Sequence, residues 1–150
     1  MTVYYADTSA LAKRYLNETG STWVRSWCNP HSVHVTIISQ LTVVEMFSLL
    51  ERRTRDGSIS GATQSALFGA FLVHRNTEFL VRSLDDSISF AAPAVIGRHG
   101  LRGLDGIQLA SALDAASSLG EALTFVSADV RLLAAATAEG FATDNPTLHP

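Results

Sequence analysis

The stretch VYYADTSALAKRYL, residues 3–16, decides the fold class. Its first four residues are apolar strand formers, and the triplet DTS (7–9) that follows them is a helix start signal. The remainder of the stretch predicts a helix over 9–16. A strand that leads straight into a helix is the repeating unit of α/β proteins.

The same alternation continues along the rest of the chain. Apolar and β-branched runs predict strands, whereas apolar residues at helical spacing predict helices. We expect further strands at 33–38, 78–84, 122–127 and 141–143, and further helices at 21–28, 40–55, 62–74, 87–98, 105–118 and 129–139. Alternating strands and helices imply a parallel sheet covered on both faces, which is a three-layer α/β sandwich.

Composition narrows the class of protein. The chain has 150 residues, 47% of them hydrophobic, and a formal charge of −3, which argues against disorder. No linker or repeat divides it, so we expect one domain over 1–150. No apolar run approaches the roughly 18 residues of a membrane span, and the N-terminus lacks the basic region of a signal peptide. The lone Cys28 excludes an internal disulfide framework, and we expect a cytoplasmic protein.

Four of the 14 acidic residues lie in apolar settings. Asp7 follows the first strand, and Glu45 interrupts LTVVEMFSLL in mid-helix. Asp105 opens the helix LDGIQLASAL, and Asp129 follows the strand TFVS. Ligands of open parallel sheets bind beyond the carboxyl ends of the strands, so three of these acids should converge on one sheet edge. Asp114 is a control, because it lies about half a turn out of phase with Asp105 and should face water.

Carboxylates that converge need protons or cations between them. Two of them about 5 Å apart repel by roughly 3 kcal/mol at an effective dielectric near 20. An all-oxygen cluster suits the hard ions Mg²⁺ and Mn²⁺, which lower the pKa of bound water and assist phosphoryl chemistry. For Asp7, Asp105 or Asp129 singly, an ordinary helix N-cap is an equal explanation, whereas Glu45 lies too deep in its helix to be one. The four together predict metal-assisted hydrolysis of a phosphodiester.

These segments resemble the PIN-domain ribonucleases, and within them the VapC-type toxins of bacterial type II toxin–antitoxin systems. YYADTSALAKRYL looks like the family's opening strand, first acid and helix, and TVVEMFSLLER looks like its second motif. LDGIQLASAL is similar to the third motif, and FVSADVRLLAAATAEGF to the closing one. The resemblance extends over essentially the whole chain. It places the catalytic, metal-binding acids on Asp7, Glu45, Asp105 and Asp129, with Asp7 and Asp105 as the surest direct ligands.

The resemblance also implies properties that no single segment shows. It implies a central parallel sheet of strand order 3-2-1-4-5 and a Mg²⁺- or Mn²⁺-dependent endoribonuclease that hydrolyses cellular RNA, commonly tRNA or ribosomal RNA. A cognate antitoxin protein and a homodimer are the partners it implies. Two other functions stay open, a catalytically silent PIN-like interaction module and a phosphatase that forms an aspartyl-phosphate on Asp7.

The chain departs from the family pattern at three positions. The third motif often has Ala after its Asp and His two residues later, where Gly106 and Gln108 stand here. Ser127 replaces a commoner Thr. No carboxylate is lost, so the substrate contacts near Gln108 are the ones expected to differ. Thr8 and Ser9 are candidates to orient Asp7.

Charge on the rest of the chain bears on RNA binding. The net charge of −3 weighs against a protein that coats nucleic acid with positive charge. Setting aside the four proposed ligands, however, leaves 11 basic residues against 10 acidic ones. Arginine suits bidentate contact with phosphate, and the alternative for each arginine is a solvated surface position. The candidate RNA contacts are Arg52, Arg53, Arg55, Arg98 and Arg102.

Overall fold

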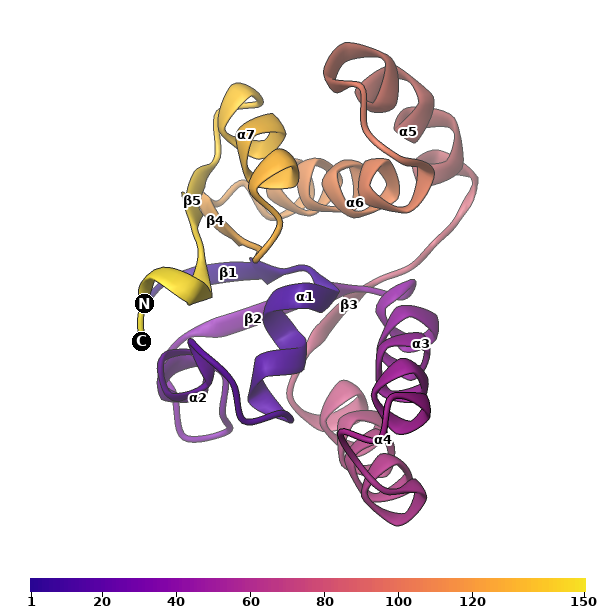
Figure 1. Cartoon of the computed structure of the whole chain (residues 1–150). Helices are drawn as coiled ribbons and strands as arrows, with labels where there is room; N and C mark the ends of the chain where they lie inside the picture. The colour runs from indigo at the N-terminus through magenta and orange to yellow at the C-terminus, as the bar shows by residue number, and fades with distance from the viewer.

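Five short strands form one parallel sheet in the computed structural model, which describes residues 1–150 (Figure 1). The strands are β1 (Val3–Ala6), β2 (Val35–Ser39), β3 (Leu80–Arg82), β4 (Leu123–Val126) and β5 (Ala142–Asp144). Their order across the sheet is β3-β2-β1-β4-β5, and every neighbouring pair is parallel. The predicted fold class and the strand order 3-2-1-4-5 are therefore confirmed.

Helices cover both faces of the sheet, and Figure 1 shows α1 to α4 on one side and α5 to α7 on the other. The helices are α1 (Thr8–Leu11), α2 (Ser21–Trp27), α3 (Thr42–Arg55), α4 (Gly61–Thr77), α5 (Asp86–His99), α6 (Gly103–Leu119) and α7 (Val130–Ala138). The helix predicted over 9–16 is shorter, because α1 passes at Ala12 into a 3-10 turn that ends at Arg14. No helix is both long enough and apolar enough to cross a membrane.

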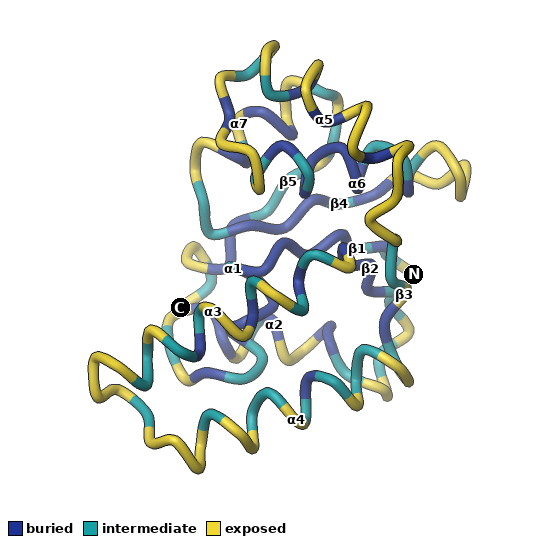
Figure 2. The backbone as a smooth tube through the Cα atoms, turned by 90° about the vertical axis from the view of Figure 1, so that its right-hand side faces the viewer, coloured by how far each residue is buried: buried dark blue, intermediate teal, exposed yellow.

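The sheet separates two hydrophobic cores, since side chains alternate between its faces along each strand. From β1, Val3 and Tyr5 belong to the core under α5 to α7, while Ala6 belongs to the core under α1 to α4. The Tyr5 ring stacks on that of Phe125 from β4, with ring centroids 5.3 Å apart. Figure 2 shows the central strands β1, β2 and β4 mostly buried and α4 largely exposed, and Phe71 is the one buried residue of α4. The central strands thus have little freedom to move the residues that follow them.

The carboxyl ends of β1 and β4 lie side by side in the middle of the sheet, where successive strands begin to be added on the opposite side. Ala6 pairs with Val126 in the register of these strands, and the Asp7 amide donates to the Val126 carbonyl at 3.1 Å. The chain proceeds from β1 to β2 on one side, whereas β4 and β5 lie on the other. Such a switch point is where ligands bind in open α/β sheets.

Helix α6 approaches α5 closely through Gly106. A Cβ atom at this position would lie 2.3 Å from Cγ1 of Ile96 on α5. The glycine at this position therefore has a packing reason, because a larger residue would collide with Ile96.

Candidate metal centre

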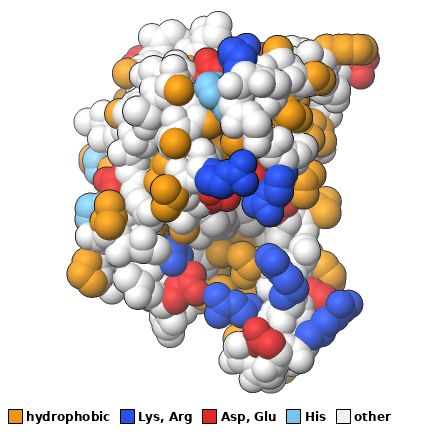
Figure 3. Space-filling view, turned by 45° about the horizontal axis from the view of Figure 1, so that its top comes forward, with side chains coloured by type: hydrophobic (Ala, Val, Ile, Leu, Met, Phe, Trp, Pro, Cys, Tyr) orange, Lys and Arg blue, Asp and Glu red, His pale blue; other side chains and the backbone are white.

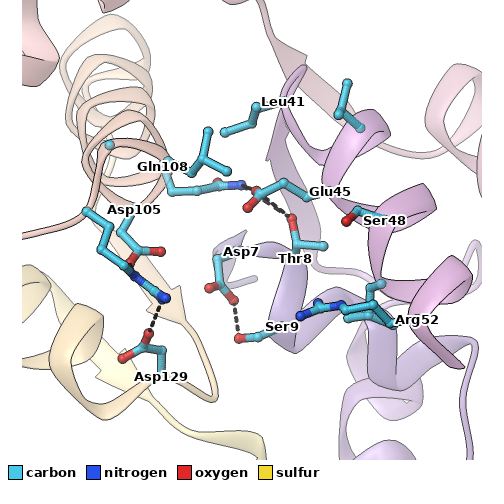
Figure 4. A pocket seen from close by; sticks show the side chains of 15 residues that line it. Asp7, Thr8, Ser9, Leu41, Glu45, Ser48, Arg52, Asp105, Gln108 and Asp129 are labelled. Atoms are coloured by element: carbon cyan, nitrogen blue, oxygen red, sulfur yellow. Dashed lines mark hydrogen bonds and ion pairs between the residues drawn. The ribbon is translucent and has the colours of Figure 1, made fainter. Parts of the chain in front are cut away.

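The four acids predicted from the sequence line one cavity beyond the carboxyl ends of the strands. The cavity has a volume of about 640 Å³, and 15 residues line it. Asp7 comes from the end of β1, Glu45 from α3, Asp105 from α6 and Asp129 from the start of α7. Figure 4 shows these side chains around a common space, and Figure 3 shows acidic and basic groups gathered around a hollow on one face. Four separate elements thus bring their carboxylates to one place.

Asp7 is almost completely buried, with 6% of its surface exposed. One carboxylate oxygen, Oδ1, accepts from Ser9 Oγ at 2.8 Å and from the Ala10 amide at 3.1 Å, so Asp7 is the N-cap of α1. The other, Oδ2, accepts from Ser127 Oγ at 3.0 Å. Burial raises the pKa of Asp7 to about 7, and the nearby charge of Glu45 also raises it, against the lowering effect of these three donors. The Asp7 carboxylate therefore carries negative charge that the protein itself compensates only in part.

Glu45 is half-buried and faces the same cavity from α3. Its Oε1 accepts from Thr8 Oγ1 at 2.9 Å and from Gln108 Nε2 at 2.7 Å. The prediction that Glu45 lies in mid-helix is wrong, because α3 begins at Thr42 and Glu45 falls in its first turn. A carboxylate in the first turn lies near the positive end of the helix dipole, which is a favourable place for an acidic side chain. Thr8, expected to orient Asp7, orients Glu45 instead, while Ser9 does orient Asp7.

Gln108 connects the cavity to the core. It is 2% exposed, and its Oε1 accepts from the buried Tyr5 hydroxyl at 2.8 Å while its amide donates to Glu45. The departure from the family pattern predicts altered substrate contacts near Gln108, and no local pattern in the sequence points to Tyr5. The polar groups of Gln108 are used inside the protein, so its contribution is to hold Glu45 in place.

Asp105 and Asp129 lie on the opposite side of the cavity and share a cation. The exposed guanidinium of Arg102 donates from Nε to Asp105 Oδ2 at 3.1 Å and places Nη2 3.6 Å from Asp129 Oδ2. Asp129 is also the N-cap of α7, since its Oδ1 accepts from the Arg131 and Leu132 amides. The N-cap explanation is therefore correct for Asp7 and Asp129.

The N-cap explanation is wrong for Asp105. The cap residue of α6 is Arg102, and Asp105 is the third residue of the helix. The helix begins two residues earlier than predicted, at Gly103, so Asp105 is directed toward the cavity, where Arg102 is its partner.

Asp114 lies outside the cavity, but the expectation that it simply faces water is wrong. Its side chain is 30% exposed and forms an ion pair with Arg82, which stands at the end of β3. The half-turn offset from Asp105 directs Asp114 to the edge of the sheet, where a cation from another element meets it.

The chemistry of the donors fits a hydrated divalent cation. No group of three or more His, Cys, Asp or Glu side chains stands close enough together to hold an ion alone. Mg²⁺ usually keeps several water ligands and takes only one or two carboxylates from the protein. An all-oxygen set around a cavity of this size, with Asp7 only partly compensated, suits Mg²⁺ or Mn²⁺ and does not suit the closed N and S sites of zinc.

A five-stranded parallel sheet of this order, with helices on both faces, defines a PIN-like fold. The chain is similar to PAE2754 from Pyrobaculum aerophilum at 23% sequence identity and a TM-score of 0.65, covering 98% of this chain and 91% of that one. It is similar to a toxin–antitoxin complex from Klebsiella pneumoniae at 17% identity and a TM-score of 0.61, covering 95% and 97%. FitAcB from Neisseria gonorrhoeae gives 16% identity and a TM-score of 0.59, covering 97% and 98%. No protein-family model and no curated protein matches the sequence.

Proposed function

We propose that this chain is a metal-dependent endoribonuclease of the PIN-domain type and the toxin of a toxin–antitoxin pair. The observation that carries this proposal is the convergence of four carboxylates, from four separate elements, on one cavity at the switch point of the sheet. A set of acids at that position, with one of them buried and its pKa raised, is a functional site candidate on physical grounds.

The proposed ligands of Mg²⁺ or Mn²⁺ are Asp7, Glu45, Asp105 and Asp129, with Asp7 and Asp105 in direct contact. Such an ion, when bound, would stabilise charge on a phosphodiester and make water a better nucleophile. Hydroxyl donors from Ser9 and Ser127 fix the orientation of the Asp7 carboxylate. Outer partners of this kind tune ligand position and basicity.

Glu45 is positioned in the same manner by neutral groups. Thr8 and Gln108 both donate to its Oε1, which leaves Oε2 free toward the cavity. In our proposal this free oxygen accepts a proton from water or holds the ion through water. Asp129 retains Oδ2 for the same purpose once Arg102 moves aside, since Oδ1 is committed to the α7 amides.

The proposed partners are a cognate antitoxin protein and a second copy of the chain. Support comes from the fold, because a structure solved as a toxin–antitoxin complex is similar over 95% of this chain. Cleavage of tRNA or ribosomal RNA is proposed from the motif resemblance.

The test is cleavage of end-labelled cellular RNA by the purified protein with Mn²⁺, with Mg²⁺ or with EDTA, in parallel with Asp7→Asn. We expect discrete fragments with either metal, and none with EDTA or with the variant. Intact RNA under every metal condition would contradict the nuclease proposal and favour the catalytically silent interaction module. Trapping of a phosphate analogue on Asp7 would instead support the phosphatase.

A further inference from the structure

One arginine at the acidic cavity is without a partner. Arg52 lines the cavity from the last turn of α3, and its side chain forms no hydrogen bond or ion pair, unlike the side chains of the other nine arginines of the chain. Figure 4 shows its side chain extending from α3 into the space beside Ser9. This exposed guanidinium is therefore available to a ligand that enters the cavity.

Its neighbours on the same helix show the ordinary alternative. Arg53 Nη2 lies 2.8 Å from Glu18 Oε2, and Arg55 Nε lies 3.2 Å from Glu51 Oε1. Cations are favoured at the C-terminal end of a helix, and pairing with a surface acid accounts for both residues. Arg52 shares the helix end but has no such acid, and it points into the cavity instead.

The charges of the cavity indicate what Arg52 binds. Two arginines and four acids line it, so its formal charge is −2 when all four acids are ionised. Arg102 is already held between Asp105 and Asp129. Arg52 is therefore the one cationic group of the cavity that is available to an incoming anion. Guanidinium binds the two non-bridging oxygens of a phosphodiester with paired hydrogen bonds.

We infer that Arg52 binds a backbone phosphate of the RNA strand that enters the cavity, and so positions the strand across the acids. This inference rests on the proposed nuclease function. A phosphate contact fixes the register of the strand and reads no base, so Arg52 contributes affinity without sequence preference. The apolar residues of the same wall, Leu49 and Val44, line the cavity beside it and offer no competing charge.

The experiment measures binding without cleavage. A fluorescent oligoribonucleotide is titrated in Ca²⁺, in place of Mg²⁺ or Mn²⁺, against the wild type, Arg52→Gln, Arg52→Lys and the matched control Arg55→Gln, and is checked to be intact after each titration. We expect Kd to rise about tenfold for Arg52→Gln, less for Arg52→Lys, and less than twofold for Arg55→Gln. The slope of log Kd against log salt should fall by about 0.7 for the loss of one contact to a single strand.

Two results would overturn this inference. One is a Kd for Arg52→Gln that lies within twofold of the Kd for Arg55→Gln. The other is a wild type that does not bind the RNA. If RNA binding is unchanged in the variant, the ligand of Arg52 would instead be a carboxylate of a protein partner. Because Arg52 is exposed and unpaired, its variants should keep the wild-type melting temperature. Failure of the nuclease proposal is read separately, since a wild type that cleaves nothing can still show the Arg52-dependent difference in Kd.

Discussion

The two sides of the acidic cavity hold their carboxylates in different ways. Asp7 and Glu45, which we call the inner pair, are held by neutral hydroxyl and amide donors. Asp105 and Asp129, the outer pair, share the guanidinium of Arg102, whose side chain is 77% exposed. Asp7 of the inner pair is buried and Glu45 is half-buried, whereas the charge of the outer pair is balanced by one exposed arginine.

This difference has a physical consequence for each pair. Neutral donors compensate a buried carboxylate only in part, so the pKa of Asp7 rises and the apo protein is destabilised there. A surface arginine compensates without burial, and the ion pair contributes little to stability. We therefore expect substitutions at the inner pair and its donors to change cleavage and stability most. Substitution of Arg102 at the outer pair should change mainly the affinity for the metal ion.

The largest effect is expected for Asp7→Asn on cleavage. Loss of a direct ligand should reduce metal-dependent RNA cleavage by more than about 100-fold, because even outer partners of metal ligands contribute 10- to 100-fold. Initial rates on one labelled RNA measure this. The exposed Asp86 in the first turn of α5 provides the control, and Asp86→Asn should stay within twofold of the wild type. Equal rates for Asp7→Asn and Asp86→Asn would remove Asp7 from the site.

The second effect concerns the pH dependence of stability without metal. The pKa of Asp7 is about 7 in the folded protein and about 3.9 in an unfolded chain, so the folded state keeps the proton longer. The free energy of unfolding should therefore fall as pH rises from about 4 to about 7, by up to about 4 kcal/mol. Urea unfolding of wild type and Asp7→Asn in EDTA checks this. The variant should lack the fall and be the more stable protein at pH 8.

The third effect is structural and falls on Gln108. Gln108→Leu removes the acceptor of the buried Tyr5 hydroxyl and one donor to Glu45, which should cost about 1–3 kcal/mol of unfolding free energy. Removing the stranded hydroxyl as well, in Gln108→Leu/Tyr5→Phe, should recover part of that loss. A double variant that is less stable than Gln108→Leu would show that Tyr5 has another acceptor.

The smallest effect is expected at the outer pair. Arg102→Gln frees Asp105 and Asp129 from their cation, and should lower apo stability by at most about 1 kcal/mol. The same change should tighten Mn²⁺ binding by a factor of about 2–5, because the ion no longer competes with the guanidinium. Isothermal titration with Mn²⁺ measures it. Weaker Mn²⁺ binding would mean that Arg102 supports the site instead of competing for it.

Local sequence carries enough information to predict the sheet and the cavity. An acid placed directly after a buried strand, as Asp7 is, must lie at the carboxyl edge whatever the rest of the fold does. The start of a predicted helix likewise directs Asp105 to that edge, and Glu45 stands out as an acid within an apolar helix. The strand order 3-2-1-4-5 came from the motif resemblance, since alternation of strands and helices is compatible with several orders.

Contacts between residues far apart in the chain are beyond what local sequence predicts. Gln108 meets Tyr5 across the interior, 103 residues apart in the chain, and Arg82 meets Asp114 from the edge of the sheet. These contacts depend on helix phase and on start residues such as Gly103, where an error of two or three residues redirects a side chain. The difference between the inner and outer pairs is thus a property of the tertiary structure.

Mn²⁺ binding to one variant from each pair tests the central claim most directly. Free Mn²⁺ is measured by electron paramagnetic resonance during titration of the wild type, Asp7→Asn and Asp105→Asn. If the two pairs form one site, both variants should lose the same high-affinity Mn²⁺ that the wild type binds. Wild-type affinity retained in either variant would contradict the claim that the four acids hold a common ion.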